Sequence, residues 1–316
     1  MIQTTAKEYI KNPYPGIRSF DTVESNLFFG REKHTYELLR VLTKTHFIVI
    51  SGASGSGKSS LVKAGLIPKL KKVSNNWTSI AFRPGNQPLN NMAEAFVDSL
   101  ADYGIDHHLI GNQKDIEKLL KLDAETVVSY FEQVEFHDNV LIYVDQFEEI
   151  FRYREDEYIA SSKEDSEHFV NLLIELSKIE SRPIFVVLSM RTDFLSDCTE
   201  FEGLPDMIND GHYLIPKMTL AEKEEAVIGP ARYAGAEISE ELRTLLRKHI
   251  LDYEISLPVL QHALMRTWDY WLINAEANQP VDVEHYKAIG TVTDALSVHA
   301  EQIYGSLPTN ELKTSY

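Results

Sequence analysis

Cysteine is almost absent from this chain, and long hydrophobic runs are absent altogether. A single cysteine, Cys198, occurs in 316 residues, so an internal disulfide is excluded and a reducing compartment is the natural environment. Nowhere do 18 apolar residues follow one another, and the first ten residues, MIQTTAKEYI, contain no apolar run of signal-peptide length. We therefore expect a cytoplasmic protein that does not enter the membrane.

Basic residues are outnumbered by acidic ones. The 31 Lys and Arg residues face 48 Asp and Glu residues, which gives a net charge of −17. Residues 1–72 carry 12 basic and 5 acidic side chains, so residues 73–316 carry a charge of −24. Because proteins that bind nucleic-acid backbones rely on clustered cations, nucleic acid is not an expected partner.

Several motifs of common enzymes are also missing. The chain has no Cys-x-x-Cys pair and no His-Glu-x-x-His sequence, so its 11 histidines do not form a zinc framework. The sequence Gly-x-Ser-x-Gly, which marks the nucleophile of many hydrolases, does not occur either. The chemistry of the protein must therefore lie in other motifs.

The chain has the composition of a globular protein, with 43% hydrophobic and 25% charged residues, and its length suggests about two domains. In its first two thirds, short runs rich in Val, Ile and Phe alternate with amphipathic stretches, which is typical of a parallel sheet covered by helices. The predicted strands are 46–51, 78–82, 140–145, 184–190 and 212–215. The predicted helices are 31–43, 57–72, 88–103, 113–134 and 163–179.

After about residue 218 the strand pattern ends and only helical patterns remain. They lie near residues 219–233, 239–250, 257–273 and 291–306. In the third, apolar side chains recur on one face, which indicates a packed core: Leu257, Leu260, Leu264, Trp268 and Trp271. The expected fold class is thus α/β in three layers, with about five mostly parallel strands, followed by an all-helical domain.

A phosphate-binding loop follows the first predicted strand. Residues 52–59, GASGSGKS, match the pattern G-x-x-x-x-G-K-[ST] without deviation and open the predicted helix 57–72. Glycines let backbone N–H groups turn toward phosphates, and the helix N-terminus adds its positive dipole. Lys58 is predicted to reach the β- and γ-phosphates and to take part in catalysis, and the Ser59 hydroxyl to ligate Mg²⁺. The predicted nucleotide-binding residues of this segment are Gly52, Ser54, Gly55, Ser56, Gly57, Lys58, Ser59 and Ser60.

A carboxylate ends the third predicted strand. In VLIYVD (140–145) the buried run ends on Asp145, and Glu148 and Glu149 follow closely. Asp145 is predicted to hold Mg²⁺ together with Ser59, because strand ends of a parallel sheet meet at one edge. Glu148 or Glu149, with a preference for Glu148, is predicted to polarise the attacking water. The alternative is a helix N-cap with two solvated glutamates in the first turn.

Arg191 follows the fourth predicted strand, at the edge that also carries the phosphate loop. An arginine there is able to pair with the γ-phosphate oxygens and to stabilise the charge that develops on them. Pairing of Arg191 with Asp193 or with a helix end is the alternative.

Together, several ordered motifs resemble the novel STAND NTPase family, which is related to the NACHT and NB-ARC signalling ATPases. Besides the phosphate loop, they are NPYPGIRSF (12–20), FFGRE (28–32), DQFEE (145–149), MRTDF (190–194) and LPVLQ (257–261). The resemblance covers residues 12–306. It implies a P-loop NTPase fold in which Gly30 and Arg31 lie near the adenine and ribose. It also implies that Pro258 packs against the base and that Arg191 senses the γ-phosphate.

The resemblance implies a switch that binds ADP or ATP with Mg²⁺. Such proteins hold ADP in a closed monomer, exchange it for ATP after a trigger, oligomerise and activate an effector, in bacteria often in signalling or antiphage defence. Slow ATP hydrolysis is expected. No sensor or effector region is recognisable, so an isolated switch module is expected, whose effector and sensor are other regions or partner proteins.

The resemblance also divides the chain into ranges. Residues 1–44 are the lead-in with the first helix, 45–217 the P-loop ATPase domain and 218–290 the helical domain. Residues 291–316 are the expected start of a winged-helix domain, whose first helix would be Asp294–Leu307.

Two other functions fit the same motifs. A scaffold could bind nucleotide without turning it over, which the incomplete winged-helix domain favours. An AAA+-like ATPase associated with DNA shares the sheet and the acidic strand, but it needs a basic DNA-binding element, which residues 73–316 do not offer.

Overall fold

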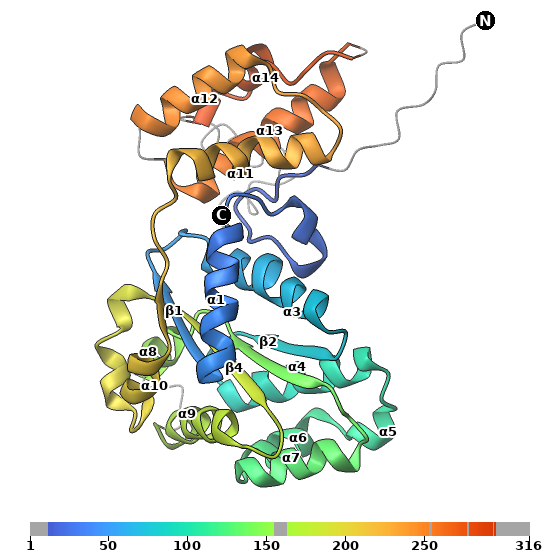
Figure 1. Ribbon diagram of the computed structural model, residues 1–316, viewed down its shortest axis with the longest axis vertical. Coiled ribbons are helices and arrows are strands. Elements are labelled where there is room, and N and C mark those ends of the chain that lie inside the picture. Colours follow the sequence, from blue (N-terminus) through green and yellow to red (C-terminus); the bar gives the residue numbers. More distant parts are fainter. Residues whose placement is uncertain (1–11, 155–162, 253–254, 277, 293, 295–316) are drawn as a thin grey trace, which may run out of the picture. The chain divides into compact units, whose positions relative to one another are not determined.

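The computed structural model describes residues 12–154, 163–252, 255–276, 278–292 and 294 (Figure 1). The chain forms two compact units: Lys33–Pro216, here called the sheet unit, and Met1–Glu32 with Lys217–Tyr316, here called the helical unit. The lead-in range 1–44 is therefore shared between the two units. The expected start of a winged-helix domain lies almost entirely outside the described residues and stays a prediction.

A five-stranded parallel sheet is the centre of the sheet unit (Figure 1). Its order is β2-β3-β4-β1-β5, so β4 separates the strand before the phosphate loop from the acidic strand. The expected α/β class and all five predicted strands are confirmed. The strands are β1 (Phe47–Gly52), β2 (Trp77–Phe82), β3 (Asn139–Val144), β4 (Ile184–Arg191) and β5 (His212–Leu214).

The three inner strands are buried on both faces, which explains their continuous apolar sequences. Side chains that alternate along β1, β3 and β4 join one large core with α4, α6, α7 and α9. The opposite face of the sheet includes Tyr143 and Ser189, whose neighbours along their strands belong to that core. The edge strands β2 and β5 are only partly buried.

Three predicted helices of the sheet unit, 31–43, 88–103 and 163–179, are confirmed, and the others differ from the prediction. The predicted helix 113–134 is wrong as a single element, because the chain turns at residues 121–123 and Asp123 caps a second helix by accepting from the Thr126 N–H. The predicted helix 57–72 is divided by a π-helical segment, and the short helices near His107, Glu149 and Leu204 were not predicted. The helices are α1 (Glu32–Thr45), α2 (Lys58–Ser60), the π-helical segment η2 (Leu61–Leu66), α3 (Ile67–Val73), α4 (Pro88–Tyr103), α5 (His107–Ile110), α6 (Gln113–Leu120), α7 (Ala124–Gln133), α8 (Glu149–Arg154), α9 (Lys163–Lys178) and α10 (Leu204–Asp210).

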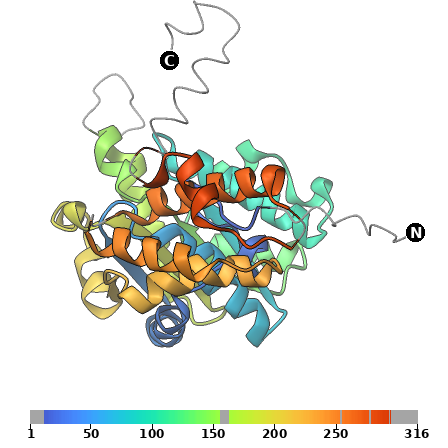
Figure 2. The ribbon, with the colours of Figure 1, turned by 90° about the horizontal axis from the view of Figure 1, so that it is seen from above.

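The helical unit contains four described α-helices, coloured orange to red in Figures 1 and 2. The apolar face predicted for the helix 257–273 packs into the core of this unit, where Leu260, Leu264, Trp268 and Trp271 are all buried. The helices are α11 (Leu220–Tyr233), α12 (Glu240–Asp252), α13 (Leu257–Asn274) and α14 (Val283–Ala288).

The described lead-in up to Glu32 is part of the helical unit. Tyr14 is buried with its ring edge against Trp268, and its hydroxyl donates to the Val227 carbonyl at 2.5 Å. Asn12 donates to the Met265 carbonyl at 2.8 Å. Through these contacts of Asn12 and Tyr14, the segment NPYPG (12–16) packs against α11 and α13. No helix in the described parts of either unit is long and apolar enough to cross a membrane.

Candidate functional site

The phosphate loop connects β1 with α2 in the sheet unit. Gly55 and Gly57 have φ angles of +70° and +92°, which L side chains rarely adopt, so the backbone of the loop depends on glycine at both positions. At Gly52 a Cβ would lie 2.2 Å from the Ile215 side chain, so glycine is required there by close packing. The loop therefore has the backbone shape that its sequence pattern predicts, directly before a helix N-terminus.

Lys58 is folded over this loop. Its ammonium donates to the carbonyl groups of Gly52 at 2.8 Å and Ala53 at 2.9 Å. Burial lowers the pKa of Lys58 below its ordinary value, while the nearby carboxylates of Glu148 and Asp145 act in the opposite direction. The ammonium is thus a partly desolvated cation held at the loop, within the electrostatic reach of both carboxylates.

Asp145 follows β3 and is 2% exposed. The β3–β4 register, in which Val144 lies beside Leu188, puts Asp145 next to Ser189. Tyr143 is two residues before Asp145 and therefore points to the same face of the sheet. The pairing of β4 with β3 thus brings the Ser189 hydroxyl to Asp145, and the alternation along β3 adds the Tyr143 hydroxyl from the same face of the sheet.

Three hydroxyl groups donate to the same oxygen of Asp145. They belong to Ser59 at 2.8 Å, Tyr143 at 2.8 Å and Ser189 at 2.7 Å, and all contact Oδ1. Burial raises the pKa of Tyr143 well above its ordinary value and the Asp145 carboxylate adds to this, so the phenol remains a donor. Ser59 and Asp145, which the sequence pairs as Mg²⁺ residues, are in direct contact.

The second oxygen of Asp145 fits a cation site. Oδ2 is buried and has no hydrogen-bond partner among the described residues. Such an oxygen is costly to bury unless a cation or water serves it, and the cation beside it among the described residues is the Lys63 ammonium at 3.7 Å. A carboxylate and a hydroxyl are hard oxygen donors of the kind that Mg²⁺ prefers. The side chains present therefore fit the metal that the motifs imply.

The two glutamates after Asp145 have different surroundings. Glu148 is 6% exposed, and its Oε2 accepts from the backbone N–H of Arg191 at 3.3 Å. Glu149 is the first residue of α8, and its Oε2 accepts from the Gly85 N–H at 3.0 Å, which ties α8 to the loop after β2. Glu148 is thus the glutamate that lies near Arg191 and Lys58, whereas the Glu149 carboxylate makes a structural contact with the loop after β2.

Arg191 ends β4 beside Gly52 of β1 in the parallel register. Its guanidinium pairs with the carboxylate of Asp193, to which both Nε and an Nη donate. The backbone of Arg191 is therefore at the edge that the sequence predicts, while its side chain makes the alternative contact with Asp193.

Gly30, Arg31 and Pro258 belong to the helical unit. Gly30 has a φ of +83°, and a Cβ on it would lie 2.2 Å from the Glu222 carbonyl oxygen of α11, so packing alone requires glycine there. Arg31 is buried, and Pro258 is the partly exposed second residue of α13. Their assignment to the base and ribose stays a prediction.

Sequence reasoning missed Tyr143, Ser189 and Lys63 at this site. Tyr143 and Ser189 lie within apolar runs, and the alternation of the strands marks them as facing one side without naming their partner. Lys63 has an ammonium 3.7 Å from Asp145 Oδ2. Its position four residues after Ser59 on the same helix was the available signal.

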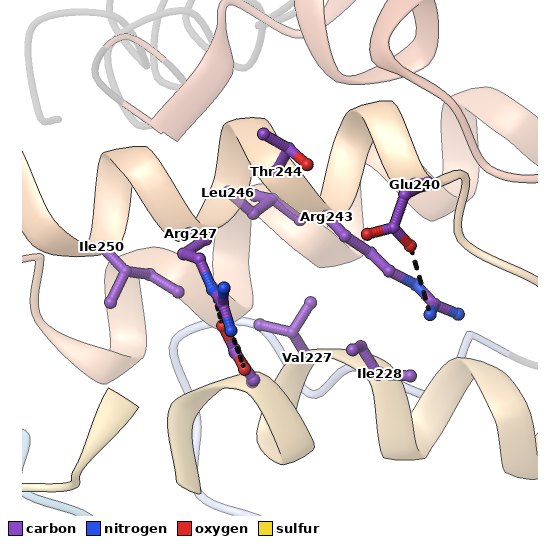
Figure 3. A pocket seen from close by; sticks show the side chains of 9 residues that line it. Val227, Ile228, Glu240, Arg243, Thr244, Leu246, Arg247 and Ile250 are labelled. Atoms are coloured by element: carbon purple, nitrogen blue, oxygen red, sulfur yellow. Dashed lines mark hydrogen bonds and ion pairs between the residues drawn. The ribbon is translucent and has the colours of Figure 1, made fainter. Parts of the chain in front are cut away.

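A separate pocket of about 210 Å³ lies between α11 and α12 (Figure 3). Arg247 pairs with Glu224 and Arg243 with Glu240 around an apolar floor that includes Val227. None of the predicted site residues lines this pocket.

Comparison with solved structures gives the same fold. A Walker-type ATPase of Pyrococcus abyssi matches with a TM-score of 0.53 at 14% identity, over 94% of this chain and 79% of that one. The ORC2 protein of Aeropyrum pernix, solved in ADPNP-ADP complexes, matches with a TM-score of 0.51 at 17% identity, over 89% of this chain and 68% of that one. Its ADP form matches with a TM-score of 0.52 at 15% identity, over 84% and 67%. These likenesses establish the fold class.

Comparison at the level of sequence identifies the family. No curated protein matches the chain. The family model described as Novel STAND NTPase 1 matches residues 13–315, nearly the whole chain. The match extends over both units and over nearly all of residues 12–306, the range in which the ordered motifs lie. By its fold and by this match, the chain belongs to the novel STAND NTPase 1 family of nucleotide-binding P-loop NTPases.

Proposed function

We propose that this protein is an ATPase switch that binds ATP or ADP with Mg²⁺ and hydrolyses ATP slowly. The observation that carries the proposal is the contact between Ser59 of the phosphate loop and the buried carboxylate of Asp145, whose second oxygen accepts no hydrogen bond among the described residues. Family membership supports nucleotide binding. The nucleotide and the metal are proposals drawn from the motifs and the donor set.

In the proposed site, loop N–H groups between Gly52 and Ser60 bind the phosphates, together with the helix N-terminus. Lys58 exchanges its contacts with the Gly52 and Ala53 carbonyl groups for phosphate oxygens. Ser59 and Asp145 hold the metal, which when bound supplies positive charge against the charge that develops on the phosphates. Most of the sheet unit, Lys33–Pro216, would thus form the ATPase domain, whose proposed range is 45–217.

The proposed hydrolysis relies on two further side chains. Glu148 accepts a proton from, or orients, the water that attacks the γ-phosphate, because it is the buried glutamate near Lys58. Arg191 leaves Asp193 and pairs with γ-phosphate oxygens, which its planar fork is suited to do. The slow rate in this proposal comes from the family resemblance and is tested by the phosphate-release assays described below.

The family supports a wider role for this chemistry. We propose that the nucleotide state controls the conformation and self-association of the chain in cytoplasmic signalling, in bacteria in antiphage defence. Gly30, Arg31 and Pro258 would bind the base and ribose from the lead-in and the helical domain (218–290). Sensor and effector would be other regions or partner proteins.

Replacement of Lys58 by Ala tests the proposal. The variant loses the cation at the loop, so ADP and ATP affinity should fall by about 100-fold or more, measured by isothermal titration calorimetry with MgCl₂. Lys69→Ala is the matched control, because Lys69 lies on α3 and its ammonium contacts Tyr36. Equal affinity of Lys58→Ala and wild type would refute nucleotide binding at this loop.

The pairing of Arg191 with Asp193 favours a second candidate, a scaffold that holds nucleotide without hydrolysing it. In that case the arginine would stay with its carboxylate and no cation would assist phosphate loss. Purified protein that retains ADP and releases no phosphate from ATP over hours, in wild type and in Asp193→Asn, would support the scaffold over the switch.

A further inference from the structure

Lys63 is a second cation at the site, on the helix that follows the phosphate loop. It lies four residues after Ser59, so both side chains project from the same face of the helix, across α2 and the π-helical segment η2. Ser59 contacts Asp145 Oδ1 and Lys63 faces Oδ2, at 2.8 Å and 3.7 Å. The helix thus offers a hydroxyl to one carboxylate oxygen and a positive charge to the other.

The charge balance of this cluster depends on Lys63. The side chain of Asp145 is 3% exposed, and three hydroxyl groups already fill Oδ1. Hydroxyl groups stabilise a carboxylate but do not neutralise it, and a buried charge without an opposite charge is strongly unfavourable. The Lys63 side chain is 29% exposed, so its ammonium reaches the carboxylate while part of the chain stays in water.

We infer that Lys63 is the built-in counter-ion of Asp145 and competes with Mg²⁺ for it. The inference rests on the proposed function, because it assigns the metal to Ser59 and Asp145. With the Lys63 ammonium in place, the negative charge of Asp145 is compensated without metal. The metal-free site is then able to bind a nucleoside diphosphate. Metal binding at Oδ2 must displace the ammonium or tolerate its repulsion, so Lys63 weakens the coupling between metal and nucleotide.

The competing explanations of this contact make different predictions. A lysine that only joins the helix to the strand would change stability and leave the effect of Mg²⁺ on nucleotide affinity unchanged. A lysine that contacts the phosphates would change nucleotide affinity equally with and without metal. Only a counter-ion that competes with the metal changes the ratio between the nucleotide affinity with Mg²⁺ and the nucleotide affinity without it.

The test measures ADP binding to the full chain by calorimetry, once in EDTA and once in excess MgCl₂. The quantity of interest is the ratio of the two dissociation constants, EDTA over MgCl₂. Lys63→Met keeps the length of the side chain and removes its charge, so the ratio should rise on the order of tenfold above the wild type. Lys63→Arg keeps the charge and should restore a ratio close to the wild-type value. Lys69→Met, on the following helix α3, is the control.

The outcomes separate this inference from the function on which it rests. A ratio of one in both the wild type and Lys63→Met contradicts the metal site itself and the inference with it. A wild-type ratio well above one, with an equal or lower ratio in Lys63→Met, overturns the counter-ion role alone. If Lys63→Met fails to fold, Lys63→Gln gives the same comparison, and the melting temperature in EDTA should be lower in either neutral variant than in Lys63→Arg.

Discussion

The sheet unit and the helical unit both contain residues that the ordered motifs single out, but their surroundings differ. In the sheet unit the motif residues from two distant segments meet, as Ser59 and Asp145 do at 2.8 Å. In the helical unit one motif residue, Gly30, is explained by close packing against α11. Polar side chains that converge on a buried carboxylate indicate a ligand site. A glycine that is required by a nearby backbone atom is explained first by the packing of the fold.

The largest expected effect concerns the two glutamates after β3. Glu148→Gln should reduce ATP hydrolysis by about 10²- to 10⁴-fold and keep ADP affinity, because the buried carboxylate is the proposed base. Glu149→Gln should change hydrolysis by no more than a few fold and lower stability by about 1 kcal/mol, since it weakens the contact with the Gly85 N–H. Phosphate-release assays on both variants decide this, and a greater loss of rate in Glu149→Gln would reverse the assignment.

In the helical unit, Gly30→Ala should lower the free energy of unfolding by about 2–4 kcal/mol, because the new Cβ meets the Glu222 carbonyl oxygen. Gly235→Ala is the matched control. Gly235 has a similar φ of +77° but no atom within 4 Å of its Cβ position, so only backbone strain of about 1 kcal/mol is expected. Denaturant titrations measure both, and equal losses would show that the close approach is not what requires glycine at residue 30.

Pro258→Ala separates packing from ligand binding in the helical unit. Proline near the start of a helix contributes little, so stability should change by less than about 1 kcal/mol. If Pro258 packs against the base as the family resemblance implies, ADP affinity should fall about 3- to 10-fold. An unchanged ADP dissociation constant would leave Pro258 with a helix-starting role alone.

The smallest effect is a pH dependence in the sheet unit. Burial lowers the pKa of His212, whose Nε2 lies 2.7 Å from the Ser51 hydroxyl at the end of β1. The unfolded chain therefore takes up this proton first as the pH falls below about 6.5, and stability is lost in that range. Denaturation of His212→Gln between about pH 7 and about pH 5 should show a shallower decline than the wild type. Identical slopes would mean that His212 does not contribute.

Much of the fold was predictable because its signals are local. The buried strands and the glycines of the loop follow from residues close together in sequence. The insertion of β4 between β1 and β3 was not predictable, because it is a long-range choice of partner. That insertion is what brings Ser189 to Asp145, so the three-hydroxyl cluster was hidden in the sequence.

The lead-in illustrates the same limit. Its proline and glycine residues correctly indicate irregular backbone, and Gly16 indeed has a φ of +74°. Nothing in residues 12–16 indicates that Tyr14 enters the core beside Trp268, more than 250 residues later. The contact of Lys63 with Asp145 is a similar case, because the helix periodicity fixes the face but not the partner.

The central claim is that Ser59 and Asp145 hold the metal of a nucleotide site, and the most direct measurement is ADP binding to Asp145→Asn with and without Mg²⁺. The amide is almost isosteric and still accepts from the hydroxyl groups, but it lacks the charge that binds the metal. The account predicts that ADP affinity in EDTA is nearly unchanged and that the gain from Mg²⁺ falls by about tenfold or more. An equal gain from Mg²⁺ in wild type and Asp145→Asn would contradict it.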